Sequence, residues 1–105
     1  MEVDLVITPN GDRTVITPDN GEYYTKGELQ GHLESGGLKL FRVEDGFMIA
    51  NPDGAELGLP YNGDGANIII DRGYNWDTVR GNIALVDASH IKVSELFNEV
   101  SIAEQ

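Results

Sequence analysis

The sequence predicts a single α+β domain over residues 1–105, with a mainly antiparallel twisted sheet, one short helix and a C-terminal helix. Three observations indicate this class. Short runs of β-branched residues alternate with turn residues, as in antiparallel strands. One threonine and glutamate have the spacing of a helix capping box. Near the end of the chain, apolar residues recur at helical spacing. A length of 105 residues is that of one domain.

The first two strands are expected at 3–7 and 13–17, where valine, isoleucine and threonine are frequent. Between them lies the Asn10-Gly11 step, which tolerates the positive φ angles of a tight turn. The chain therefore begins with a predicted β-hairpin.

The short helix is expected at about 26–35. Thr25 can cap the amides of its first turn, and Glu28, three residues later, can reach back to the cap. Leu29 and Leu33 fall on one face at a spacing of four residues. This helix contains two glycines, so we expect packing rather than propensity to stabilise it.

Residues 38–59 indicate a three-stranded meander. The apolar phase changes near Leu40, which predicts a bulge there. Asp45-Gly46 predicts the first turn and Asn51-Pro52-Asp53-Gly54 the second, because Asp, Asn, Pro and Gly suit tight turns. The third strand is expected to end at Leu57-Gly58-Leu59-Pro60.

Three elements are expected in the remaining chain. Ile68-Ile69-Ile70 favours a strand because all three residues are β-branched. Ile83-Ala84-Leu85-Val86 is apolar throughout, which predicts a central strand buried on both faces. The C-terminal helix is expected at about 94–103, with Ser94 as its cap. Its apolar stripe consists of Leu96, Phe97, Val100 and Ala103.

The charge is strongly negative, with 18 acidic residues against 7 lysines and arginines and a formal net charge of −11. This balance argues against electrostatic attraction to nucleic acids or anionic membranes, and we expect direct binding to neither. No apolar run reaches the ~20 residues of a membrane helix and no basic leader is present, so we expect a cytoplasmic protein.

The acidic residues suggest where a partner binds. No basic residue occurs between Arg42 and Arg72, while six carboxylates do. They are expected at turns and loops, together with nearby aromatic residues, where they can form one or two surfaces for a basic protein partner. Plain solubility and adaptation to a high-salt cytoplasm are the alternative explanations of the charge. The residues assigned to partner binding are Glu44, Asp45, Asp53, Glu56, Asp64, Asp71, Tyr74 and Trp76, with Tyr61 as a further aromatic residue.

No catalytic residue, cofactor or metal is expected. The chain lacks cysteine, and its serines and histidines match no hydrolase or zinc-site spacing. The Asn62–Asn67 segment lacks the ligand spacing of an EF-hand loop and is interpreted as a turn. Two alternative functions remain open: a virion or assembly component, and a small metal-dependent hydrolase. The residues of the hydrolase alternative are Asp64, Asp71, Asp77 and His90.

A set of turn-forming residues between Glu28 and Asp87 occurs in a recognisable order. It comprises Glu28-Leu29-Gln30, Gly36-Gly37, Asn51 with Gly54, Leu59-Pro60-x-Asn62, and Gly81-Asn82 before Ile83-Ala84-Leu85-Val86. In this order the chain resembles a family of small proteins of unknown function carried by tailed phages and plasmids. The resemblance implies an accessory protein of a phage or other mobile element with an α+β fold, located in the host cytoplasm. It implies no catalytic residues.

Overall fold

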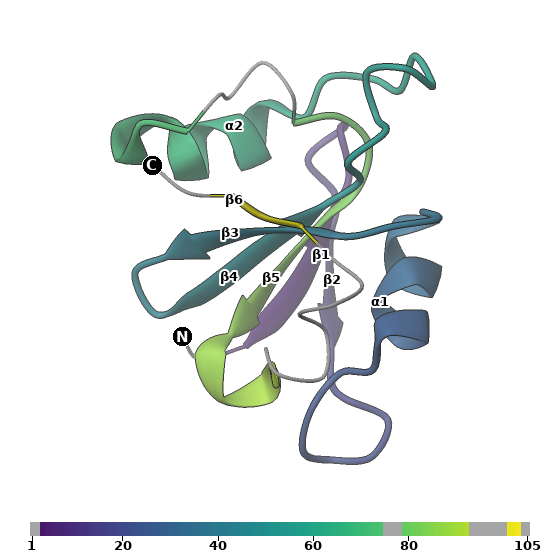
Figure 1. Ribbon diagram of the computed structural model, residues 1–105, viewed down its shortest axis with the longest axis vertical. Helices are drawn as coiled ribbons and strands as arrows, with labels where there is room; N and C mark the ends of the chain where they lie inside the picture. The colour runs from purple at the N-terminus through teal and green to yellow at the C-terminus, as the bar shows by residue number, and fades with distance from the viewer. Residues whose placement is uncertain (1–2, 75–78, 93–100, 104–105) are drawn as a thin grey trace.

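The computed structural model describes residues 3–74, 79–92 and 101–103. Within these residues one sheet has the strand order β2-β1-β5-β4-β3-β6, and two helices pack against it (Figure 1). All pairings are antiparallel except that of β6 with β3. The fold is therefore α+β with a mainly antiparallel sheet. The strands are β1 (Asp4–Ile7), β2 (Arg13–Ile16), β3 (Lys39–Val43), β4 (Gly46–Ala50), β5 (Ile83–Asp87) and β6 (Ser101–Ala103). The helices are α1 (Lys26–Leu33) and α2 (Gly63–Ile69), with 3-10 turns η1 (Ile70–Arg72) and η3 (Ala88–His90).

The sheet begins with the predicted hairpin. β1 and β2 pair antiparallel from Asp4 opposite Ile16 to Ile7 opposite Arg13, which confirms the hairpin. β5 lies between β1 and β4, and its residues are buried or half-buried. The prediction of a central strand at Ile83–Val86 is therefore confirmed. A central strand is apolar on both faces because a helix or loop covers each side of the sheet.

The helix expected at about 26–35 corresponds to α1, which ends at Leu33. Its capping box is present: Thr25 Oγ1 accepts a bond from the Glu28 amide at 3.2 Å, and Glu28 Oε1 accepts one from the Thr25 amide at 3.3 Å. Leu29 and Leu33 are buried against the sheet. The helix stops early because Glu34 adopts a left-handed conformation with φ of 52°.

The core consists of two apolar clusters, one on each face of the sheet. The α1 side contains Leu29, Leu40 and Val86, and the α2 side contains Phe41 and Ile69. Leu40 and Phe41 are thus both buried although they point to opposite faces, and the pairing of β3 with β4 continues without interruption. The predicted bulge near Leu40 is wrong, since the change of apolar phase reflects burial on both faces.

The first turn of the expected meander also differs from the prediction. Glu44 and Asp45 form the first turn, and Gly46 is already the first residue of β4. A Cβ on Gly46 would lie 1.9 Å from the carbonyl oxygen of Val86, so the close approach of β5 requires glycine there. The turn after β4 is present, with the Gly54 amide bonded to the Asn51 carbonyl at 3.3 Å.

The third strand of the meander, expected to end at residues 57–60, is absent from the described structure. This segment continues in turns, with the Leu57 amide bonded to the Asp53 carbonyl and the Leu59 amide to the Gly54 carbonyl. Leu57 is 64% exposed, so its apolar side chain has no core to join. A single bridge between Tyr61 and Arg80 takes the place of a strand pairing among the described residues.

The strand predicted at Ile68–Ile70 is wrong, because α2 and η1 occupy this segment. The side chain of Asn62 caps the helix by accepting a bond from the Gly65 amide at 2.9 Å. Ala66 and Ile69 then face the sheet, one helical turn apart. β-branched residues lower helix propensity by only a few tenths of a kcal/mol, so burial against the sheet decides the conformation.

The C-terminal helix expected at about 94–103 is wrong at its end, because residues 101–103 form β6. This strand pairs in parallel with β3, from Ser101 opposite Lys39 to Ala103 opposite Phe41. Pairing satisfies backbone groups that β3 would otherwise leave exposed at the sheet edge, which a stripe of apolar residues cannot indicate. Residues 94–100 lie outside the described structure.

Candidate functional site

The six acidic residues assigned to partner binding divide between two ends of the sheet. Glu44 and Asp45 form the turn between β3 and β4, at the end of the sheet where η1 also lies. Five residues of strand, about 16 Å, separate this end from the turns that follow β4. All six side chains are exposed or half-buried, and they do not form one continuous acidic face. Near the first end are Glu44, Asp45 and Asp71, and near the second are Asp53, Glu56 and Asp64.

The end that carries Glu44 and Asp45 also contains a groove with an apolar floor. The groove has a volume of about 260 Å³ and runs between the sheet and α2. Val43 and Leu85 form its floor, and Ile68 forms its wall. Glu44, Asp45 and Arg72 complete the lining. We call this set of residues the acidic groove.

Apolar surface continues from the acidic groove toward the edge strand β2. Leu85 pairs with Leu5, and Leu5 pairs with Val15, so the three side chains lie in one row on the α2 side of the sheet. Leu5 and Leu85 are half-buried and Val15 is 61% exposed. α2 therefore covers only part of its face of the sheet, and the uncovered row adjoins the carboxylates of the acidic groove.

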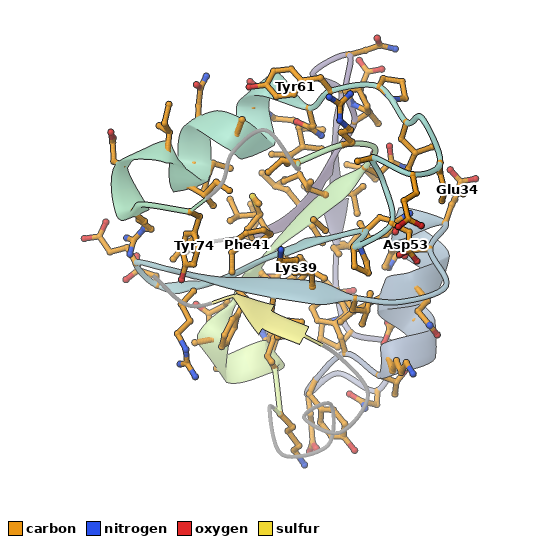
Figure 2. The ribbon with its side chains drawn as sticks, turned by 45° about the horizontal axis from the view of Figure 1, so that its top comes forward. Glu34, Lys39, Phe41, Asp53, Tyr61 and Tyr74 are labelled. Atoms are coloured by element: carbon orange, nitrogen blue, oxygen red, sulfur yellow. The ribbon has the colours of Figure 1, made fainter. Side chains whose placement is uncertain are left out.

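The aromatic residues assigned to partner binding do not form a surface with these carboxylates. Tyr74 is 8% exposed and packs edge-on against Phe41, with ring centroids 5.1 Å apart (Figure 2). Its assignment to a contact surface is therefore wrong, because its ring is buried in the core between the sheet and α2. Trp76 lies outside the described residues. Tyr61 is 41% exposed but bridges to Arg80, near the opposite end of the sheet.

A buried polar network that the sequence does not indicate lies near the start of β1. Asp4 is 3% exposed and accepts three bonds: from the Tyr24 hydroxyl at 2.7 Å, from His90 Nδ1 at 2.6 Å and from the Asp87 amide at 2.9 Å. Burial, and after it the hydrogen bond to Asp4, raises the pKa of Tyr24 above its ordinary range. The network links β1, the entry to α1 and the end of β5, and we assign it a structural role.

The sequence contains one indication of this network. Asp4 is a charged residue inside an otherwise apolar strand, and a buried carboxylate needs donors. Those donors come from positions 20, 83 and 86 residues later, so local pattern cannot identify them. A second carboxylate nearby, Asp87, accepts bonds from the hydroxyl and amide of Ser89, which lower its pKa.

The residues of the hydrolase alternative are distributed over the molecule. Asp64 lies in the first turn of α2 and Asp71 in η1, beyond the other end of the same helix. His90 contacts Asp4 instead. Within the described part of the chain, no three histidine, aspartate or glutamate side chains are close enough to hold a metal ion. Asp77 lies outside the described residues.

Two of the motifs that carry the family resemblance, Leu59-Pro60-x-Asn62 and Gly81-Asn82, meet at the second end of the sheet. Asn62 is fully buried, and its Nδ2 donates to the carbonyls of Ile7 at 3.1 Å and Gly81 at 2.9 Å. The Gly81 amide donates to the Pro60 carbonyl at 2.8 Å. Leu59, Pro60, Gly81 and Asn82 also line a surface cavity of about 330 Å³. The acceptors of the three hydrogen bonds are backbone carbonyls at the end of β1 and in two loops, so the motif residues hold these segments together.

No protein-family model, no curated protein and no solved structure matches this chain. Among the described helices, none has the length and apolar character that crossing a membrane requires. The arguments about function below therefore depend on the geometry of the acidic groove.

Proposed function

We propose that this chain is a non-enzymatic interaction protein of a phage or other mobile element, and that it binds a basic host or phage protein in the host cytoplasm. The acidic groove is the binding site. The observation that supports the proposal is the position of Glu44 and Asp45 beside an uncovered apolar row of the sheet. Carboxylates next to exposed apolar surface suit a segment that carries both lysine or arginine and large apolar side chains.

The two kinds of surface have different roles in the proposed complex. Exposed ion pairs contribute only about 0.2–1 kcal/mol each and weaken with salt, so Glu44 and Asp45 mainly steer and select the partner. Burial of apolar surface contributes about 25 cal/mol per Å² and supplies most of the affinity. Val15 and Leu85 are the side chains with surface to contribute. Binding is expected to weaken with salt without being abolished by it.

The partners that fit this chemistry include proteins whose own site binds DNA or RNA. Such a site is basic, and the two carboxylates of the acidic groove can occupy it as phosphates do. An inhibitor or anti-defence factor acts in this way. The same charge prevents this chain from binding nucleic acid directly.

The two acidic ends of the sheet provide a matched test. The double variant Glu44→Gln/Asp45→Asn neutralises the groove, and Asp53→Asn/Glu56→Gln makes the same charge change at the opposite end. Proteins captured from host lysate are quantified for both variants and for the unchanged chain. We expect the groove variant to reduce capture of a basic partner about fivefold, from two ion pairs. We expect the control to leave capture unchanged.

A third variant tests the apolar row separately. Val15→Thr keeps the β-branched shape and replaces one exposed methyl group with a hydroxyl group. It is expected to weaken capture equally at low and high salt, whereas the groove variant loses its effect at high salt. If both double variants reduce capture of the partner equally, the net charge of the chain, and no particular groove, attracts the partner. Altered sedimentation of the Val15→Thr variant alone would show that a second copy of the chain covers this row.

A further inference from the structure

A surface cavity of about 330 Å³ lies at the second end of the sheet, away from the acidic groove. It is surrounded by the turn between β1 and β2, the end of α1, the loop that follows β4 and the loop before β5. Pockets that bind small molecules begin at about 300 Å³. The cavity therefore has room for a small ligand.

The walls of this cavity are largely apolar. Leu33 comes from α1, Pro9 from the turn between β1 and β2, and Leu59 and Pro60 from the loop that follows β4. Leu59 and Pro9 are half-buried and Pro60 is exposed, so apolar carbon atoms remain accessible here. The cavity therefore favours a ligand whose groups are apolar or weakly hydrated.

The charge beside these walls is negative. Glu34 lines the cavity at the end of α1, is exposed, and has no ion pair or side-chain hydrogen bond within the described residues (Figure 2). None of the described residues that line the cavity is a lysine or an arginine. The carbonyl end of a helix also carries partial negative charge, and α1 ends here. Both features attract a cation.

Glu34 is an unfavourable residue for the helix that it follows. Among the described residues it is the one non-glycine residue with a positive φ, 52°, and glycine or asparagine is usual at such a position after a helix. A carboxylate at the C-terminal end of a helix is also repelled by the helix dipole. Residues that break local preferences in this way concentrate at functional sites, and a bound cation would offset the repulsion.

Two carboxamide groups also line the cavity. Asn82 is half-buried and Asn10 is exposed, and neither side chain makes a hydrogen bond within the described part of the chain. Each carboxamide has an oxygen that accepts hydrogen bonds, and the carboxylate of Glu34 has two. The cavity thus combines apolar walls with several acceptor atoms and one negative charge.

We propose that this cavity binds a guanidinium group carried on a short alkyl chain, as in arginine. A guanidinium has five N–H donors and no acceptor, which suits a carboxylate beside carboxamide oxygens. It is also more weakly hydrated than an ammonium group, so it enters an apolar cavity more readily. The ligand is either a free guanidino compound or the arginine side chain of a peptide. This site is independent of the acidic groove and of the function proposed for it.

Acetyl-arginine amide is the probe for a peptide side chain, and ethylguanidinium is the probe for a free compound. In ¹⁵N-labelled protein, each is expected to shift the backbone amide signals of Leu59, Gly81 and Asn82 in a saturable way, with a dissociation constant in the millimolar range. Acetyl-citrulline amide has the shape of the arginine probe without its charge and is expected to bind about tenfold more weakly. Potassium chloride at the same ionic strength is expected to give no saturable shift.

Three substitutions test the role of the carboxylate. Glu34→Gln removes the charge at nearly constant size and is expected to weaken binding of the arginine probe about fivefold without affecting the citrulline probe. Glu22→Gln makes the same charge change at an exposed position before α1, and is expected to keep the preference for arginine. Glu34→Gly removes the carboxylate but supplies the residue that the left-handed conformation favours. It is expected to lose the preference while raising Tm.

Saturable binding of either guanidino probe, with a preference over citrulline that depends on Glu34, supports the site, and the tighter probe identifies the source. The proposal is overturned if neither guanidino probe gives a saturable shift, or if the arginine and citrulline probes bind equally. It is also overturned if Glu34→Gln retains the full preference. An equal loss of preference in Glu22→Gln overturns it as well, since the net charge of the chain then attracts the probe.

Discussion

Loss of the Asn62 side chain is expected to destabilise this fold strongly. It is fully buried, caps α2 through the Gly65 amide and donates to the carbonyls of Ile7 and Gly81. The Asn62→Ala substitution removes all three bonds. Loss of a helix cap costs about 1 kcal/mol, and each carbonyl that loses its buried donor costs about 1 kcal/mol more. The free energy of unfolding is therefore expected to fall by about 3 kcal/mol.

Urea denaturation followed by circular dichroism measures this change. A loss of about 3 kcal/mol is a large share of the 5–15 kcal/mol of a typical domain, and lowers Tm by about 15 °C. Asn67→Ala is the matched control, because Asn67 lies on the exposed side of the same helix. It is expected to change stability by less than about 0.5 kcal/mol. A similar small loss for Asn62→Ala would refute the role given to the three bonds.

The Asn62→Asp variant tests the donor role by itself. It keeps an oxygen for the Gly65 amide but turns a second oxygen toward the two carbonyls. That environment raises the pKa of the new carboxyl in the folded state, so its protonated form is the stabilising one. Stability relative to the unchanged chain is therefore expected to be greater at pH 4 than at pH 7, and to fall as the pH rises through the folded-state pKa. A gap independent of pH would contradict this reasoning.

Two further substitutions test the buried network and the close approach of two strands. Tyr24→Phe is expected to cost about 1–2 kcal/mol at pH 8 by urea denaturation, because Asp4 loses a donor. The pKa of Tyr24 is raised above 10.0 in the folded state, so its contribution is complete below pH 10 and is lost as the pH rises further. The gap between the two proteins should then close by up to about 1.4 kcal/mol per pH unit, and a constant gap would contradict the raised pKa. Gly46→Ala is expected to cost more than about 2 kcal/mol, since its Cβ would meet a carbonyl at 1.9 Å. Gly31→Ala, in α1 with open space around the new Cβ, should stabilise by up to about 1 kcal/mol, and equal effects of both would contradict this account.

Local signals predicted those elements whose cause is local. The hairpin of β1 and β2 depends on a turn sequence and on β-branched runs. The start of α1 depends on two side chains that bond the backbone three residues away, Thr25 and Glu28. The apolar run of β5 predicted a central strand because burial on both faces leaves a trace in composition. In each case the interacting groups are neighbours in sequence or share one strand.

Local sequence patterns gave wrong predictions where contacts between residues far apart in the sequence determine the structure. The isoleucines at 68–70 favour a strand by themselves, but Asn62 and the sheet surface make the segment helical. Leu40 suggested a bulge because no local pattern shows that β3 is covered on both sides. Tyr74 suggested surface contact, and only the position of Phe41 places its ring in the core.

For the candidate sites, the sequence by itself determined that the surface is acidic and that basic residues are missing between Arg42 and Arg72. Only the tertiary structure decided that these carboxylates divide between two ends of the sheet, and that one pair adjoins an uncovered apolar row. It alone shows the three donors of Asp4. Charge is a sum over residues and can be counted along a chain. A groove or a buried bond joins residues from different strands, so its position depends on the pairing of the sheet.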